Sequence, residues 1–190
     1  MIKAVIFDCF GVLVTDGWHP FKHRYFANDP EKNAEASRLN DLTNKGVLGY
    51  QEFLHMIGHL AGISSEQVKN KLSTNAPNEH LFELITELKT DYKIGLLSNA
   101  AENWLDELIG PENVELFDEI ILSCDISANK PSKQAYEMTA QKLGCELSEC
   151  LFIDDIKTYV EAAQSSGMKT IHYTTLEQTI SDIKVLLSGS

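Results

Sequence analysis

The chain has 190 residues, of which 43% are hydrophobic and 23% are charged, and its net charge is −12. This composition predicts one folded core with a modest appendage and excludes wholesale disorder. The acidic balance disfavours nucleic acid as a partner, and no apolar stretch reaches the roughly 18 residues that a membrane span needs. The four cysteines form no CxxC pair and no secretory pattern follows Met1, so we expect a cytoplasmic protein with reduced thiols.

The first expected element is a short strand near the N-terminus. Residues 5–7 are apolar at consecutive positions, and Asp8 follows them at once. This pattern is typical of a strand that is buried on both faces, as in a parallel sheet. Asp8 would then lie at the carboxyl end of the strand, where open α/β sheets bind ligands. Gly11 would let the chain turn and its backbone approach whatever Asp8 faces.

A long helical segment separates this strand from the next one. Helical spacing or helix-start residues predict four helices, over residues 18–26, 30–42, 50–61 and from 64 onward. The last of them begins with a capping serine, Ser64 or Ser65, ahead of Gln67. The insertion has roughly 65 residues, which is too long for a strand–helix crossover. We therefore interpret residues 16–81 as a helical cap.

Two groups of residues in this cap could bear on function. His55 and His59 lie one helical turn apart, but the glutamate of a zinc-protease helix is missing between them. A partly buried helix face is therefore the better interpretation of this pair. The aromatic and basic segment 18–26 is either the apolar face of a cap helix or a pocket wall. The residues expected on the cap side of a pocket are Trp18, His19, His23, Arg24 and Tyr25.

Strands and helices alternate from residue 77 to the C-terminus. Strands are expected over residues 93–97, 119–122, 150–153 and 168–172. Helices are expected over residues 81–89, 101–109, 130–143 and 176–187, with a further one that ends at 166. This alternation specifies right-handed βαβ units and a mainly parallel sheet. The predicted fold is a doubly wound α/β core, residues 1–15 and 82–190, with the inserted cap between its two parts.

Polar residues follow three of the predicted strands or precede a helix: Asp8, Ser98, Asn99, Lys130, Asp154 and Asp155. They should converge, because the carboxyl ends of parallel strands share one edge of a sheet. Together they offer a carboxylate nucleophile, a hydroxyl donor, a fixed cation and an acidic pair suited to Mg²⁺. This set suits phosphoryl transfer, where catalysis is mainly positioning and charge neutralisation. The alternative for the acidic pair is an exposed turn that caps the next helix.

Four segments also resemble known motifs. VIFDCFGVL, LLSNA, NKPSKQAY and LFIDDIKTYVEAAQSSGM resemble, in this order, the four motifs of the haloacid dehalogenase (HAD) superfamily of hydrolases. KGVLGYQEF resembles a cap segment that is common in phosphatase-like members. The resemblance covers nearly the whole chain. It implies a Rossmann-like HAD core with a helical cap, and a Mg²⁺-dependent hydrolase of a small phosphorylated metabolite, acting as a monomer or homodimer.

The resemblance also implies a role for each catalytic residue. Asp8 would be the nucleophile, which forms an aspartyl-phosphate that water then hydrolyses. Ser98, together with the backbone near Asn99, would hold the phosphoryl oxygens of the substrate. Lys130 would neutralise these oxygens and keep Asp8 ionised.

For the metal, the resemblance implies Asp8, Asp155 and the carbonyl of Phe10 as direct ligands, with Asp154 acting directly or through water. Phe10 departs from the pattern of the phosphatases, which usually have an aspartate here as the general acid and base. Phenylalanine can transfer no proton, and such help is typically worth about 10²–10⁴ in rate. We therefore expect a slow or restricted phosphatase that favours good leaving groups.

Two alternatives to a phosphatase stay open. Phe10 is compatible with a catalytically silent HAD fold that serves as a binding or regulatory protein. An aromatic residue at this position also occurs in 2-haloacid dehalogenases, whose aspartate attacks carbon without a metal. The acidic pair Asp154–Asp155 argues against the dehalogenase, which needs no metal. Tyr159 is a further departure, because related motifs often have asparagine there, and it is expected to loosen the support of the metal loop.

Overall fold

The computed structural model describes residues 1–73, 75–100 and 105–188. Five parallel strands form one sheet: β1 (Ala4–Phe7), β2 (Lys93–Ser98), β3 (Glu119–Leu122), β4 (Cys150–Asp154) and β5 (Lys169–His172). Their order is β3-β2-β1-β4-β5, so that β1 lies in the middle with β2 and β4 on its two sides. The predicted doubly wound parallel sheet is confirmed.

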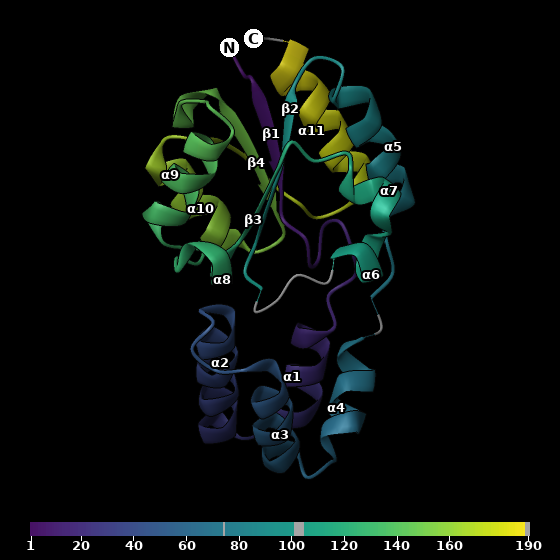
Figure 1. The fold of residues 1–190 in the computed structure, drawn as a ribbon, viewed down its shortest axis with the longest axis vertical. Coiled ribbons are helices and arrows are strands. Elements are labelled where there is room, and N and C mark those ends of the chain that lie inside the picture. The colour runs from purple at the N-terminus through teal and green to yellow at the C-terminus, as the bar shows by residue number, and fades with distance from the viewer. Residues whose placement is uncertain (74, 101–104, 189–190) are drawn as a thin grey trace.

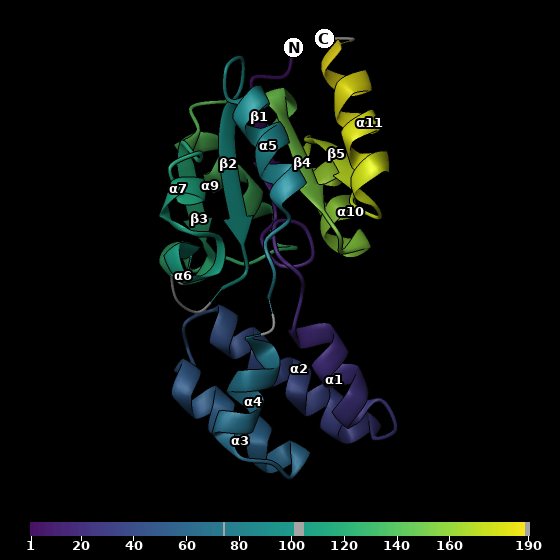
Figure 2. The same ribbon diagram turned by 90° about the vertical axis from the view of Figure 1, so that its right-hand side faces the viewer.

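Helices cover both faces of the sheet (Figures 1 and 2). One face packs against α5 (Glu79–Leu88), α6 (Leu105–Ile109), α7 (Pro111–Val114) and α11 (Leu176–Ser188). The other packs against α8 (Ser123–Ile126), α9 (Lys133–Lys142) and α10 (Lys157–Ser166). Successive side chains of a strand point to opposite faces. Accordingly, Val5 and Phe7 of β1 belong to the first cluster, and Ala4 and Ile6 belong to the second. All four are buried, which explains the consecutive apolar run.

Some short elements differ from the prediction. The helix expected over 101–109 is described only as α6, because its first four residues lie outside the described part of the chain. Three further turns of helix were not predicted: α7, α8 and the 3₁₀ helix η1 (Leu147–Glu149). Elements of three or four residues are too short to show a helical period in the sequence.

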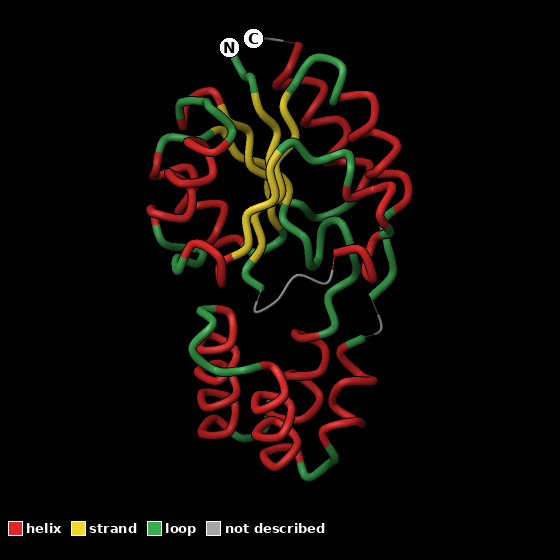
Figure 3. Tube along the Cα trace, in the orientation of Figure 1, coloured by secondary structure: helices red, strands yellow, loops and turns green. Residues whose placement is uncertain are grey.

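Four helices form a separate layer beyond the carboxyl edge of the sheet, while both termini lie at the opposite end (Figures 1 and 3). They are α1 (Trp18–Phe26), α2 (Pro30–Asn44), α3 (Tyr50–Ala61) and α4 (Ser65–Leu72). They pack around their own apolar cluster, which includes Phe26, Leu39 and Ile57. We call this layer the cap. The predicted start of the last helix is confirmed, because Ser64 and Gln67 form a capping box.

Two expectations about the insertion need correction. His55 and His59 are exposed rather than partly buried, because they lie opposite the buried side of α3, which carries Phe53 and Ile57. Leu81, placed at the end of the predicted cap, is fully buried in the cluster on the sheet. It belongs to α5, which packs on the core. None of the helices in the described residues is long and apolar enough to span a membrane.

The two chain segments that join cap and core run side by side. The backbone N–H of Thr15 donates to the carbonyl of Ala76 at 3.0 Å, and the N–H of Ala76 donates to the Thr15 hydroxyl at 2.9 Å. Gly17 lies so close to the end of α4 that a Cβ there would be 2.5 Å from the carbonyl oxygen of Leu72. A side chain at residue 17 would therefore push the two segments apart.

The cap has a second attachment at the C-terminal end of α2. The Ser123 hydroxyl donates to the carbonyl of Asn44, and the Asn129 amide donates to Asp41 at 2.9 Å. Both donors come from the core, on the segment between β3 and α9. The cap is therefore fixed to the core at two places, on opposite sides of the carboxyl edge of the sheet.

Replacing Gly17 with alanine is expected to lower the free energy of unfolding by about 1–3 kcal/mol more than the same change at Gly49. Both glycines precede a helix at the N-cap position, so the loss of an N-cap glycine is common to both variants. A Cβ at residue 49 would have nothing within 4 Å, whereas at residue 17 backbone must move. Urea unfolding of the two variants measures the difference, and equal midpoints would contradict the tight contact.

Candidate active site

The carboxyl ends of three neighbouring strands meet at one place. Asp8 follows β1 directly, Ser98 ends β2 and Asp154 ends β4. The register aligns them, because Phe7 lies opposite both Leu96 and Ile153 in the flanking strands. The central position of β1 therefore places Asp8 between the ends of its two neighbours. The structure brings together residues that are up to about 150 positions apart.

Lys130 is inserted between two of these strand ends. Its Nζ donates to Asp8 Oδ1 and to Asp154 Oδ2, both at 2.6 Å. All three side chains are buried, and that of Lys130 is only 1% exposed. The rings of Phe152 and Tyr159 lie 5.4 and 5.2 Å from Nζ and add cation–π contacts. A lysine so far from water is tolerable only because these partners replace its hydration.

The balance of charge in this group is negative. Burial lowers the pKa of Lys130, but Asp8 and Asp154 raise it further, so the pKa lies above its usual value and the lysine stays charged. Burial raises the pKa of Asp8 to about 8, against the opposing effect of Lys130, and Asp154 adds to the rise. Burial and Asp154 also raise the pKa of Asp155. One cation does not suffice to hold all three carboxyl groups ionised in this buried place, so the group favours a further positive charge.

Asn99 holds the backbone of Lys130 in place. The N–H of Lys130 donates to Asn99 Oδ1 at 2.9 Å, and Asn99 Nδ2 donates to the carbonyl of Lys130 at 3.0 Å. Nδ2 also approaches the Tyr159 hydroxyl at 3.4 Å. The asparagine side chain therefore positions the lysine, whereas binding of phosphoryl oxygens by the backbone near Asn99 stays a prediction. Tyr159, which stands out in the sequence only because related motifs often have asparagine there, contacts both Asn99 and Lys130.

Ser98 presents an unsatisfied hydroxyl to a cavity. Its side chain is 1% exposed, and its Oγ has no hydrogen-bond partner among the described residues. Buried polar atoms are nearly always paired, because an unpaired one costs the free energy of its lost hydration. Ser98 lines the same cavity as Asp8 and Lys130. The arrangement suits an oxygen-rich ligand that would accept the hydrogen bond.

Three carboxylates fit a divalent cation. Asp8, Asp154 and Asp155 each offer an oxygen, and these oxygens lie within 4.8 Å of one another. Asp155 Oδ1 is buried without a hydrogen-bond partner among the described residues. Both oxygens of Asp154 are engaged, one by Lys130 and one by the N–H of Ile156 at 2.8 Å. Hard oxygen ligands and surplus negative charge match Mg²⁺, and the geometry favours Asp155 over Asp154 as a direct ligand.

Gly11 brings the loop after β1 against this acidic group. A Cβ at residue 11 would lie only 2.3 Å from Asp155 Oδ2, and its φ of +92° also disfavours any other residue. The glycine thus lets the backbone that follows Phe10 pass directly beside the Asp155 carboxylate. The sequence predicted such a close approach at Gly11, and the structure identifies Asp155 as the group approached.

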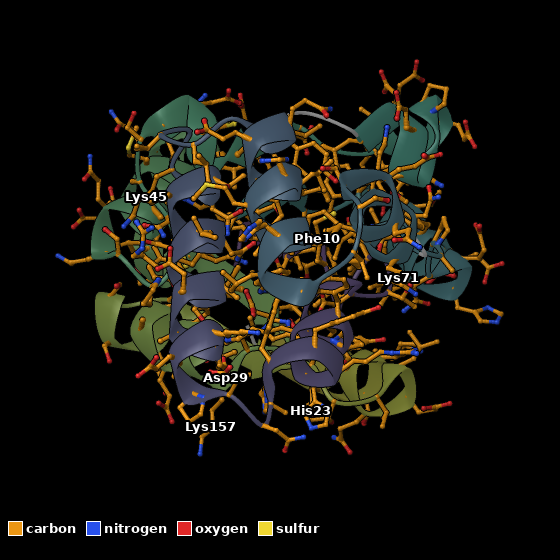
Figure 4. All side chains as sticks on the ribbon, turned by 90° about the horizontal axis from the view of Figure 1, so that it is seen from below. Phe10, His23, Asp29, Lys45, Lys71 and Lys157 are labelled. Carbon is orange, nitrogen blue, oxygen red and sulfur yellow. The ribbon has the colours of Figure 1, made fainter. Side chains whose placement is uncertain are left out.

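A cavity of about 520 Å³ opens between this edge and the cap. Aromatic side chains from both sides line it: Phe10 from the core, and Trp18, Tyr50 and Phe53 from the cap. Figure 4, seen from the cap side, places Phe10 near the middle of the molecule beneath the cap helices.

Only part of the predicted cap-side lining is present. Trp18 and His19 line the cavity, whereas His23, Arg24 and Tyr25 do not. His23 is exposed at the edge of the molecule (Figure 4), and the Tyr25 ring packs against other aromatic rings of the cap. Sequence reasoning missed Asp16, which also lines the cavity. Its position just before a helix was the only available signal.

Fold and site together define an α/β protein with a ligand site at the carboxyl edge of its sheet. Residues 6–173 match the profile of the haloacid dehalogenase-like hydrolase family, and the chain therefore belongs to that family. It is 24% identical to the sesquiterpene phosphatase astK of Aspergillus oryzae, over 97% of this chain and 96% of that protein. It spans only 36% and 19% of the length of two other curated relatives that it matches.

Solved structures show the same fold. A predicted HAD-like family hydrolase from Porphyromonas gingivalis superposes with a TM-score of 0.76 at 24% identity, covering 98% of each chain. A HAD family enzyme from Bacteroides thetaiotaomicron, solved with magnesium and inorganic phosphate, gives a TM-score of 0.72 at 24% identity. This match covers 92% of the present chain and 95% of the Bacteroides enzyme.

Replacing Lys130 with methionine is expected to destabilise the metal-free protein by about 3–5 kcal/mol, because Asp8 and Asp154 would stay buried without their cation. Lys157→Met is the matched control, since Lys157 is exposed and forms only a surface pair with Glu161 at 3.7 Å. Its loss should cost less than about 1 kcal/mol. Urea unfolding in EDTA measures both values, and similar midpoints would contradict the role of the buried lysine.

Proposed function

We propose that this protein is a Mg²⁺-dependent phosphatase that hydrolyses small phosphate monoesters through an aspartyl-phosphate on Asp8. One observation carries the proposal: a buried carboxylate–lysine group at a cavity lies beside two polar atoms without a hydrogen-bond partner in the described part of the chain. These atoms are Ser98 Oγ, on a residue that lines the cavity, and Asp155 Oδ1, on a carboxylate that lies within reach of Asp8. The pair of unsatisfied atoms is complementary to a phosphoryl group and its metal. Phosphoryl transfer needs little else from a protein than positioning and electrostatic stabilisation.

Each residue has a distinct part in the reaction. The carboxylate of Asp8 attacks phosphorus, the bond to the leaving oxygen breaks, and water later attacks the same phosphorus to release phosphate and restore Asp8. Lys130 neutralises phosphoryl oxygens while it remains bonded to Asp154. Ser98 donates its hydroxyl proton to a phosphoryl oxygen. Asn99 keeps Lys130 in place during both steps.

The acidic residues have a separate part, which is to hold the metal. Asp8, Asp155 and the carbonyl of Phe10 would bind Mg²⁺, with Asp154 supporting the site through Lys130 or through water. The ion would offset the negative charge that gathers on the phosphoryl oxygens. Removing the charge of Asp155 would remove a ligand without removing the nucleophile.

The relatives support this choice of reaction and substrate class. The Aspergillus relative is a phosphatase by name, and the Bacteroides enzyme was solved with magnesium and phosphate. A cavity of about 520 Å³ suits a small phosphorylated metabolite. We further propose that the chain works in the cytoplasm as a monomer or homodimer. The four free cysteines agree with a reducing compartment.

The protein is expected to hydrolyse p-nitrophenyl phosphate and acetyl phosphate with Mg²⁺ and to lose this activity in EDTA. Both are activated compounds whose leaving groups need little protonation, so Phe10 should limit them least. Asp8→Asn should reduce hydrolysis to the uncatalysed rate. Asp125→Asn, a change at an exposed aspartate outside the cavity, is the matched control and should retain full activity.

Absence of turnover with both compounds would contradict the proposal. Metal binding without turnover would then indicate a catalytically silent HAD fold. Release of halide from a 2-haloacid that persists in EDTA would instead indicate a dehalogenase, in which Asp8 attacks carbon.

Mg²⁺ alone is expected to stabilise the folded protein. At 100 times its Kd, a ligand of the native state adds about 2.7 kcal/mol, which corresponds to a rise of several degrees in Tm. Asp155→Asn should abolish most of this rise because it removes a charged ligand, whereas Asp125→Asn should keep it. Thermal unfolding with and without Mg²⁺ measures the shift. An equal shift in both variants would show that Mg²⁺ does not bind at Asp155.

A further inference from the structure

The proposed reaction leaves one requirement unmet at Phe10. When the bond between phosphorus and an alcohol oxygen breaks, the departing oxygen gains an electron pair and needs a proton unless it is well stabilised. Phe10 lines the cavity beside Asp8 but has no proton to give. Efficient cleavage of such a bond would therefore need a donor from another element that faces the same cavity.

Among the described residues, His19 is the one histidine that lines the cavity. It lies in the first turn of α1, on the cap side. Imidazole is the side chain whose charge changes between about pH 5 and 8, so it can both give and take a proton near neutrality. Its position across the cavity from Asp8 and Ser98 suits a group that acts on the leaving part of a substrate.

Asp16 orients this imidazole. Its Oδ2 lies 2.5 Å from His19 Nδ1, and the same oxygen accepts from the backbone N–H of His19 at 2.9 Å. Its other oxygen accepts from the N–H of Trp18 at 2.8 Å, so the carboxylate is fixed at three points. Bonding through Nδ1 leaves His19 Nε2 without a hydrogen-bond partner in the described chain. A carboxylate that fixes one imidazole nitrogen and leaves the other available is the arrangement of a general acid and base.

We propose that His19, held by Asp16, is the general acid and base of the phosphatase reaction in place of the residue at position 10. As Asp8 attacks, the bond between phosphorus and the leaving oxygen breaks, and that oxygen takes a proton from His19 Nε2. The neutral imidazole then takes a proton from the water that attacks the aspartyl-phosphate, and the electron pair of the broken bond returns to Asp8. This inference rests on the proposed phosphatase function.

The charges around His19 favour its protonated form. The hydrogen bond that His19 donates to Asp16 raises the pKa of His19, as do the charges of Asp16 and Asp155, against the opposing effects of partial burial and of Lys22. A cap role alone does not account for the pair, because Asp16 already accepts from two N–H groups of α1 without the imidazole.

The test compares two aryl phosphates that differ only in a para nitro group, phenyl phosphate and p-nitrophenyl phosphate. The nitro group stabilises the departing phenolate, so only phenyl phosphate needs an acid. His19→Ala and His19→Gln should lower kcat/KM for phenyl phosphate by about 10²-fold and for p-nitrophenyl phosphate by no more than a few-fold. Glutamine can still donate a hydrogen bond to Asp16, so rescue by His19→Gln would indicate a merely structural role.

His23→Ala is the matched control, because His23 lies on the same helix, is exposed at the edge of the molecule and does not line the cavity (Figure 4). It should leave both rates unchanged. Equal losses on both esters, no loss on either, or rescue by glutamine would overturn the role of His19 while the proposed function stands. Wild type that hydrolyses only the nitrophenyl ester would also overturn it, and failure on both esters would overturn the proposed function as well.

Discussion

The buried ammonium group of Lys130 is the constraint on which the rest of the site depends. It joins the ends of β1 and β4 to the segment before α9 through two hydrogen bonds of 2.6 Å. A buried lysine is stable only where carboxylates, rings and a fixed backbone surround it. Asp8 and Asp154 supply the charge, and Asn99 fixes the backbone. Each of these residues therefore has a structural reason for its place that is independent of any substrate.

The same constraint leaves the site receptive to further positive charge. Lys130 is shared by two carboxylates, and Asp155 adds a third within reach of a single ion. The tight contact at Gly11 keeps the neighbouring loop against Asp155. The folded protein thus holds an arrangement of oxygen atoms that a divalent cation would stabilise. This surplus of negative charge favours a divalent cation, and the bound cation would in turn offer positive charge to a phosphate group.

Much of this site could be predicted from the sequence, because runs of consecutive apolar residues mark the buried strands of a parallel sheet and therefore the positions where these strands end. The positions of Asp8, Ser98 and Asp154 depend only on that pattern and on sheet geometry. Contacts of Tyr159 with Lys130 and Asn99 depend on how α10 packs, which no local pattern encodes. The exposure of His55 and His59 could have been predicted from the sequence, since both lie opposite the buried positions of α3.

Asp16 and His19 show why the chemistry was harder to predict than the fold. An aspartate three residues before a histidine at a helix start is an ordinary capping pattern, and its cavity-facing position arises only from the fold. With the proton donor on α1, the reaction depends on how the cap sits over the sheet. The paired segments around Thr15 and Ala76, together with the contact at Gly17, set that position. Where position 10 has an acid, the loop after β1 protonates the leaving group. With phenylalanine there, protonation of the leaving group would depend instead on how the cap is attached to the core.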